Sequence, residues 1–172
     1  MPDAPGLELI RGEIEQGHPG AVLDTSFDRG QPALVVDPAQ ILAVLGWLRD
    51  APGQGYRFLS SLHAADYLPS TPRFGVHYEL LNRDRVERIR VKAMLSDPSA
   101  GALPEIDSCV SLFPTAGFQE REAYDFFGIV FKGHPDLTRI LMPEDYVGWP
   151  QRRDFPVGGE QVTFTYNERR YG

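Results

Sequence analysis

Cysteine is almost missing from this sequence of 172 residues, since Cys109 is its one cysteine. A single thiol cannot form an internal disulfide, and alone it cannot ligate an iron-sulfur cluster or a structural zinc ion, both of which need several protein ligands. We therefore exclude cysteine-based cofactor sites within this chain. Cys109 is expected to be a small buried hydrophobic residue.

A long apolar run and a surplus of positive charge are missing too. No stretch approaches the roughly 20 apolar residues that cross a bilayer, and the N-terminal MPDAPGLELIRGEIEQG lacks the unbroken apolar stretch of a secretory signal. The formal net charge of -7 argues against binding of DNA or RNA, because neutralising phosphates requires an excess of Lys and Arg. We expect a cytoplasmic protein that does not bind nucleic acid.

Motifs for nucleotide binding and for hydrolysis are absent as well. The chain has neither a G-x-G-x-x-G fingerprint nor a Walker loop. His18, His63 and His77 are scattered and show no pairing at ligand spacing. Ser60 and Ser61 precede His63, but neighbouring residues of a strand point to opposite faces, and no nucleophile elbow surrounds them. We therefore expect no catalytic site in this region.

What remains is the pattern of one globular domain that is 42% hydrophobic and 24% charged. A first helix is predicted from the helical spacing of Leu7, Ile10 and Ile14, with Gly17 as its end. A second helix begins with Asp37 as N-cap. Its first position is Pro38, and its apolar face comprises Ile41, Val44, Leu45 and Leu48.

Extended segments surround these two helices. The predicted strands cover residues 21–27, 32–36, 56–61, 74–80 and 89–95. The last two form a hairpin, because residues 82–84 favour a turn and because polar and apolar side chains alternate along both strands. The order of elements predicts an α+β fold, in which a mostly antiparallel mixed sheet and its helices form a two-layer sandwich.

A third helix is predicted over residues 116–127. Thr115 is placed to cap its start, and Gly128 can adopt the left-handed conformation just past its end. Within this helix Arg121 and Asp125 stand four residues apart, where an ion pair is sterically easy.

The sequence from residue 132 to residue 172 follows neither the helical nor the strand period, although short strands near residues 162–166 fit it. Prolines interrupt it, yet it contains six aromatic residues, which a disordered tail would lack. Its six basic and six acidic residues cancel. We predict a body over residues 1–131 and an extended, irregular C-terminal arm over residues 132–172 that docks on a partner. The alternative is that the arginines of the arm pair locally with nearby carboxylates.

One cluster could supply a metal site, and its members are Glu120, Glu122, Asp125, His134 and Asp136. Glu120 points roughly 160° away from Glu122 around the helix, and His134 is the one histidine nearby. We therefore prefer a structural interpretation, in which Glu122 and Asp125 hold the following turn through Arg or backbone N–H groups. His134 precedes a proline and is expected to have a turn or interface role.

The run EREAYDFFGIVFKGHPDLTRILMPEDYVGWPQRRDFP, from Glu120 to Pro156, resembles the signature region of the thirty-kilodalton subunit family of respiratory complex I, also called component C of that complex. The matching elements are E-R-E-x-Y-D, F-G-I, G-H-P-D-L, R-I-L-M-P and G-x-P-x-R-x-D-F-P. The residues that carry the resemblance, and that we assign to a partner interface, are Glu120, Arg121, Glu122, Asp125, Gly128, His134, Pro135, Arg139, Pro143, Trp149, Arg152, Arg153, Asp154, Phe155 and Pro156.

The resemblance implies a non-catalytic subunit of the peripheral arm of a proton-translocating NADH:quinone oxidoreductase. Such a subunit scaffolds the large quinone-site subunit, component D, and lies near component B and other peripheral-arm subunits. It holds no cofactor or metal of its own. It is located on the cytoplasmic side of the cell membrane and contacts the membrane only through the complex.

Two alternatives remain open at this point. The same signature occurs in membrane-bound hydrogenases, formate hydrogenlyase and ferredoxin-linked quinone reductases, although the R-I-L-M-P-E-D-Y and R-R-D-F-P stretches look closest to quinone-reducing members. An alternative from a different class is a free-standing, carboxylate-dependent metal hydrolase that uses Glu122, Asp125 and His134.

Overall fold

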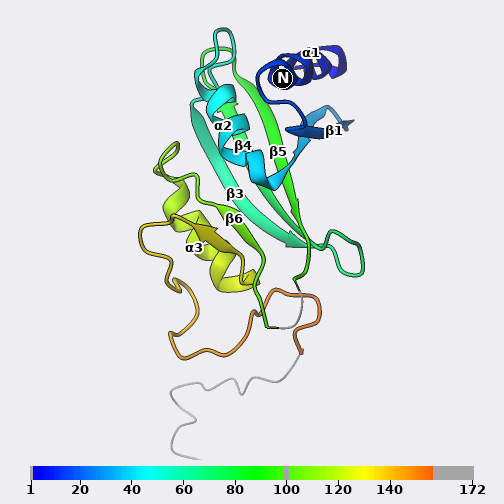
Figure 1. Cartoon of the computed structure of the whole chain (residues 1–172). Coiled ribbons are helices and arrows are strands. Elements are labelled where there is room, and N and C mark those ends of the chain that lie inside the picture. The colour runs from blue at the N-terminus through cyan, green and yellow to red at the C-terminus, as the bar shows by residue number, and fades with distance from the viewer. Residues whose placement is uncertain (1, 99–100, 157–172) are drawn as a thin grey trace, which may run out of the picture.

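The computed structural model describes residues 2–98 and 101–156. At its centre is a five-stranded sheet, with the helices packed on one side of it (Figure 1). In chain order the strands of this sheet are β1 (Val22–Asp28), β2 (Gln31–Val36), β3 (Phe58–Asp66), β4 (Phe74–Asn82) and β5 (Glu87–Leu95).

The strands lie in the order β1-β2-β5-β4-β3. β2 and β5 are parallel, whereas the other three neighbouring pairs are antiparallel. This arrangement confirms the predicted mostly antiparallel mixed sheet. β3 continues to Asp66, beyond the predicted end at residue 61, because it pairs with β4 along its whole length and such pairing overrides weak local propensity.

Two helices cover the core side of the sheet: α1 (Ala4–Gly17), which packs beside β1 and β2, and α2 (Ile41–Asp50). The side chain of Asp3 caps α1 by accepting a 2.8 Å hydrogen bond from the amide of Gly6. Asp37 accepts from the amide of Ala39 and opens a 3-10 turn, η1 (Pro38–Gln40), that leads into α2. Both apolar faces are buried, as their spacing predicted.

The helices and the sheet enclose one core. The fully buried residues that β4 contributes to it are Phe74, Val76, Tyr78 and Leu80. Burying a side chain of this size stabilises the fold by about 1.5–3 kcal/mol, so this strand is a main source of stability. Cys109 lies in the same core, which confirms its predicted role.

The C-terminal part of the body is built around α3 (Ala116–Phe127), which packs beside β3 (Figure 1). A small parallel sheet of β6 (Glu105–Asp107) and β7 (Val130–Lys132) accompanies it. The sequence did not predict this sheet, because strands of three residues have too little alternation to recognise.

Of the two predicted ends of α3, the first is wrong and the second is confirmed. Thr115 has helical backbone angles, with φ -66 and ψ -16, and its side chain makes no capping hydrogen bond, so that prediction is wrong. A capping side chain normally requires an extended backbone at its own residue. Gly128 does adopt the left-handed conformation, with φ 70, and ends the helix as predicted.

Residues 133–156 follow β7 and contain no helix or strand; they run across the end of the molecule that carries α3 (Figure 1). We refer to them as the terminal segment. The strand predicted near residues 162–166 lies outside the described residues. Of the helices in the described ranges, none is both long enough and apolar enough to cross a membrane.

Candidate partner interface

The residues of the signature run gather at one end of the molecule. They occupy α3, the turn after it, and the terminal segment. Because the terminal segment has no regular secondary structure, its backbone groups cannot pair within the segment as they would in a helix or a sheet. Its conformation is held by hydrogen bonds to the rest of the chain and by a few turns within the segment itself.

Asp125 is the main anchor, and its carboxylate is wholly buried. One oxygen, Oδ2, accepts hydrogen bonds from three consecutive backbone amides, those of Ile140, Leu141 and Met142, at 3.0, 2.7 and 2.9 Å. The other, Oδ1, accepts a 2.7 Å bond from Arg139. Burial alone would raise the pKa of Asp125, but these four donors outweigh it and lower the pKa to about 2.

Arg139 distributes its guanidinium donors over several acceptors. Besides the carboxylate of Asp125, it donates to that residue's backbone carbonyl and to the carbonyls of Tyr146 and Gly148, each at 3.0 Å. Its guanidinium carbon also lies 4.7 Å from the ring centroid of Trp149. The ion pair between Arg121 and Asp125 that the helical spacing would allow does not form, because Arg139 and the three amides occupy the carboxylate.

Gly128 and Trp149 meet at the turn after α3. A Cβ atom added to Gly128 would lie 2.5 Å from the indole of Trp149, so only glycine permits this approach. The indole also packs edge-on against Tyr124, with ring centroids 5.2 Å apart. Gly128 therefore has two roles: it ends the helix, and its lack of a side chain leaves the space in which the Trp149 indole packs.

Arg121 and His134 fix the start of the terminal segment. Arg121 donates to the carbonyls of Thr138 and Arg139 at 3.0 and 2.9 Å. His134 Nε2 lies 3.0 Å from the carbonyl of Gly117, and since a carbonyl can only accept, Nε2 carries the proton. His134 Nδ1 is then the acceptor for the amide two residues later, at 3.0 Å. This confirms the predicted turn role of His134.

A second anchor lies around Arg73, which sequence patterns did not single out. This buried guanidinium donates 2.7 Å hydrogen bonds to the carboxylates of Asp66, Asp97 and Asp154. Burial opposes ionisation of Asp66, but hydrogen bonds from Arg73 and from the amides of Arg153 and Leu68 lower its pKa to about 2. The three carboxylates are far apart in the chain, so nothing local in the sequence indicates the cluster.

Arg152 and Arg153 also contact their own chain. Arg152 Nε donates a 2.7 Å bond to the carbonyl of Phe127, and its guanidinium carbon lies 4.9 Å from the ring centroid of Phe74. Arg153 donates from its side chain to the carbonyl of Leu68 at 2.6 Å. The side chains of both arginines thus bond to backbone carbonyls in distant parts of the chain, and not to nearby carboxylates as the alternative interpretation expected.

The acidic residues of α3 do not converge on a metal site. Glu120 is buried and accepts from Ser108 Oγ at 2.6 Å and from the amide of Cys109 at 2.8 Å. Burial raises the pKa of Glu120 despite these hydrogen bonds. Glu122 is exposed and does not hold the following turn, so only the Asp125 half of that prediction is confirmed. Within residues 2–98 and 101–156, no three His, Cys, Asp or Glu side chains are grouped to hold a metal ion.

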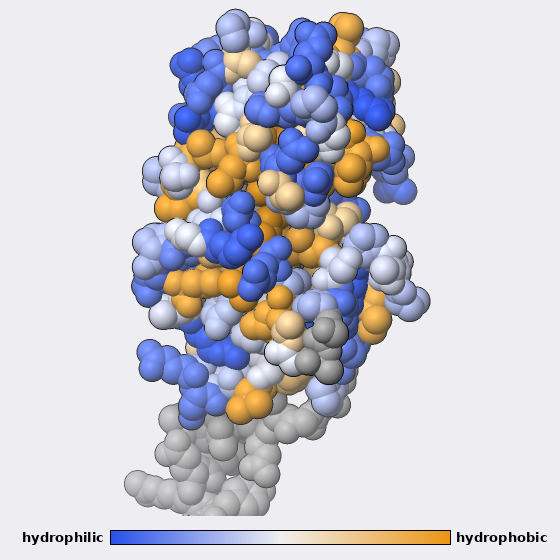
Figure 2. Space-filling model, in the orientation of Figure 1, coloured by the Kyte–Doolittle hydropathy of each residue, from blue (hydrophilic) through white to orange (hydrophobic). Residues whose placement is uncertain are grey.

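The terminal segment directs other signature residues outward. Pro135, Pro143 and Pro156 are exposed, while Phe155 packs against Gly148, where an added Cβ would lie 2.7 Å from its ring. The exposed apolar side chains of this segment are Ile140, Leu141 and Val147, at 37%, 61% and 89%. Figure 2 shows apolar side chains at the surface over this end of the molecule.

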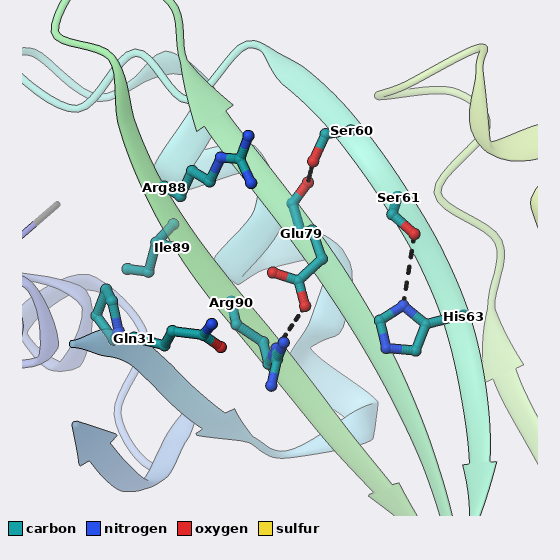
Figure 3. A pocket seen from close by; sticks show the side chains of 9 residues that line it. Gln31, Ser60, Ser61, His63, Glu79, Arg88, Ile89 and Arg90 are labelled. Carbon is teal, nitrogen blue, oxygen red and sulfur yellow. Dashed lines mark hydrogen bonds and ion pairs between the residues drawn. The ribbon is translucent and has the colours of Figure 1, made fainter. Parts of the chain in front are cut away.

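A separate polar surface lies on the open face of the sheet (Figure 3). A β-bulge between Leu59 and Ser61 brings both Ser60 and Ser61 to the same hollow, so the expectation that they point to opposite faces is wrong. His63 and His77 are also not scattered, because they lie opposite each other on β3 and β4 with stacked rings. Only the folded sheet brings them together.

The family model described as the 30 Kd subunit of the respiratory-chain NADH dehydrogenase matches residues 34–161. The chain is 48% identical over 141 residues to the C component of the NADH-quinone oxidoreductase of Herpetosiphon aurantiacus, covering 82% of this chain and 80% of that protein. Identity to the corresponding C component of Roseiflexus castenholzii is 43% over 161 residues, with 94% and 90% covered.

A solved chain of the membrane-bound sulfane sulfur reductase, an archaeal respiratory membrane complex, has the same fold, with a TM-score of 0.67 at 22% identity. The match covers 95% of this chain and 90% of the solved one. The family model spans most of the present sequence, and the relatives exceed 40% identity over most of its length. The chain therefore belongs to the 30 kDa subunit family of the respiratory-chain NADH dehydrogenase.

Proposed function

We propose that this chain is the non-catalytic component C in the peripheral arm of a proton-translocating NADH-quinone oxidoreductase. Its main partner is the large quinone-site subunit, component D, with component B and other peripheral-arm subunits nearby. The chain lies on the cytoplasmic side of the cell membrane and contacts the membrane only through the complex. Residues 1–131 form its body, and residues 132–172 form the arm that docks on component D.

The relatives support this assembly rather than one with a different electron donor. Both subunit relatives, from Herpetosiphon aurantiacus and Roseiflexus castenholzii, are named as parts of an NADH-quinone oxidoreductase. The solved sulfane sulfur reductase chain has 22% identity and supports the fold alone. We therefore take NADH as the electron donor of the assembly.

The observation that carries the scaffold role is the anchored terminal segment. Asp125 and Arg73 each collect donors or acceptors from several points of the chain and hold an irregular backbone in one conformation. This conformation exposes Leu141 and Val147. A surface that is ordered in advance loses little conformational entropy on binding, and exposed apolar side chains supply the area to bury.

The metal-hydrolase alternative receives no support from the described residues. Asp125 already accepts four hydrogen bonds. His134 uses both ring nitrogens in contacts with its own backbone, and Glu122 is exposed to solvent. The three residues named for that chemistry thus have separate environments.

The scaffold role can be tested in the assembled complex. The variant of this chain has two substitutions, Leu141→Asp and Val147→Asp, and carries an affinity tag. We would purify the complex through this tag and quantify the other subunits by mass spectrometry. Placing two carboxylates in a desolvated contact is costly, so we expect component D to be depleted at least tenfold.

A matched control replaces two exposed aliphatic residues elsewhere. Leu9→Asp together with Val86→Asp changes the charge equally, at side chains that are 71% and 78% exposed on α1 and in the turn before β5. The control should retain component D. Full retention of component D by the Leu141/Val147 variant would show that the terminal segment is not the docking surface.

A further inference from the structure

The second face of the sheet is uncovered in the part of the chain that the structure describes. The helices contribute to a single core on the opposite face, and Figure 3 shows side chains of β3, β4 and β5 on the near side of the sheet with a helix behind it. Two hollows of about 520 and about 390 Å³ lie on this face and share Gln31 and Arg90. Because they share these two residues they adjoin each other, and we refer to the pair as the depression.

The charge of this depression is opposite to that of the chain. Its cationic lining residues are Arg29, Arg88, Arg90 and Lys92, and its carboxylates are Asp28 and Glu79. The whole chain has a net charge of -7. Glu79 is the direct cross-strand neighbour of Arg90 and bonds to it. Among the described residues, no carboxylate bonds to Arg88 or Lys92.

The spacing of these cations suits an extended chain. Arg88, Arg90 and Lys92 alternate with buried residues on β5 and therefore lie on one face. Side chains two residues apart on a strand are about 6.7 Å apart. An extended peptide that runs along β5 has the same repeat, so carboxylates at alternate positions would meet the three cations in turn.

The floor of the depression is formed by aromatic rings that carry no charge near neutral pH. The rings of His63 and His77 stack with centroids 5.0 Å apart, and the Tyr67 hydroxyl lies 3.0 Å from His77 Nε2. Tyr67 reaches this position across Gly75, where an added Cβ would lie 2.8 Å from its ring. Burial, together with nearby positive charges, lowers the pKa of His77 to about 3. The positive charge of this face thus comes from Arg and Lys.

We propose that the open face of the sheet docks an extended acidic segment of a partner protein, with alternate carboxylates over Arg88, Arg90 and Lys92. This depends on the proposed function only in that the chain works inside an assembly. The surface is distinct from the terminal segment, since no residue of 133–156 lines either hollow. The chain thereby has two docking surfaces, one apolar and one cationic.

Site-specific cross-linking in the assembled complex tests the occupant. A photoreactive phenylalanine at Gln31, an exposed residue shared by both hollows, should give one major adduct to a partner segment with Asp or Glu at alternate positions. Arg88→Glu together with Lys92→Glu should reduce this adduct at least tenfold. An adduct to a segment without carboxylates, or no protein adduct, would overturn the proposal.

A second experiment uses the isolated full-length chain. A fluorescein-labelled peptide of alternating Glu and Thr should bind, with an affinity that falls on adding salt and falls about tenfold or more in the Arg88/Lys92 variant. The control, Arg11→Glu with Arg57→Glu, changes the charge equally at residues that line neither hollow. Equal loss in both variants would overturn the proposal, as would binding to phosphatidylglycerol vesicles but not to the peptide.

The docking of component D on the terminal segment and the docking of an acidic segment on the sheet can be disproved independently of each other. The Arg88/Lys92 variant should retain component D, whereas the Leu141/Val147 variant should lose it. If the peptide and the cross-link both fail while the Leu141/Val147 variant still loses component D, only the acidic-segment proposal is wrong.

Discussion

Asp125 Oδ1 and Arg139 Nη1 lie 2.7 Å apart, in an ion pair whose carboxylate is completely buried. The pair joins α3 to a segment fourteen residues further along the chain. Because the other carboxylate oxygen receives three backbone amides, one side chain determines the conformation of several residues. Both signature elements, the helix and the R-I-L-M-P stretch, meet in this contact.

Replacing Asp125 by Asn should destabilise the fold by about 3 kcal/mol, because an amide has one acceptor oxygen and its NH2 group would face either Arg139 or the backbone donors. Urea unfolding, followed by circular dichroism, measures the free-energy change. The exposed Asp145→Asn should change it by less than about 0.5 kcal/mol. An equal effect of the two substitutions would contradict the anchoring role of Asp125.

Gly128→Ala should displace Trp149, because the new methyl group would lie 2.5 Å from the indole. Gly133→Ala is the matched control, since Gly133 also has positive φ, at 81, but its Cβ would meet nothing within 4 Å. Tryptophan fluorescence in a Trp47→Phe background reports on Trp149 alone. We expect a red-shifted emission only for Gly128→Ala, and identical spectra would rule out the steric account.

Arg73→Lys should weaken the second anchor although the charge is kept, because an ammonium group cannot reach three carboxylates with a planar fork. We expect a loss of about 2 kcal/mol in unfolding free energy and faster proteolysis of the terminal segment. Arg11→Lys, at an exposed pair with Glu8, should cost less than about 0.5 kcal/mol. Unchanged proteolysis of the Arg73 variant would contradict its anchoring role.

Acid should destabilise the protein through its buried carboxylates. The pKa of Asp125 and that of Asp66 are lowered from 3.8 to about 2 in the folded chain. Their stabilisation is therefore complete above about pH 4 and is lost as the pH falls towards 2, at about 2 kcal/mol each. Unfolding at several pH values measures this slope, which should be shallower in Asp125→Asn than in the wild type.

His77 adds a loss of stability at milder pH. Its pKa falls from 6.5 to about 3 on folding, so the folded state favours the neutral ring. The contribution of His77 is complete above about pH 6.5 and declines as the pH falls, by about 2–3 kcal/mol between pH 6.5 and about 4.5. His77→Gln should remove this part of the slope, and an unchanged slope in this variant would contradict its assignment to His77.

Much of the fold follows from local patterns. The spacing of Leu7, Ile10 and Ile14 predicted α1, and the alternation along residues 74–80 predicted β4, because each pattern directly reflects which side faces the core. Sequence patterns failed to predict strands that are very short and strand ends that depend on pairing with a neighbouring strand. β6 and β7 have three residues each, and β3 extends beyond its predicted end because β4 pairs with it.

For the candidate interface, the sequence identified the residues but not their contacts. Asp125 and Arg139 both stand in the signature run, yet the helical repeat offered Arg121 as the nearer cation for Asp125. Arg73 lies outside the run, and its carboxylate partners come from distant parts of the chain. Spacing reports only neighbours along one element, so contacts between elements escape it.

By itself, the sequence determined the family and the α+β class, and it predicted a patterned body followed by an aromatic C-terminal arm. These properties depend on residue order, periodicity and a long specific motif. Only the tertiary structure decided that Asp125 binds residues 139–142, that Arg73 gathers three carboxylates, and that several cations line one face of the sheet. Hydrogen bonds and charge clusters depend on distances in space, and those distances exist only after the chain has folded.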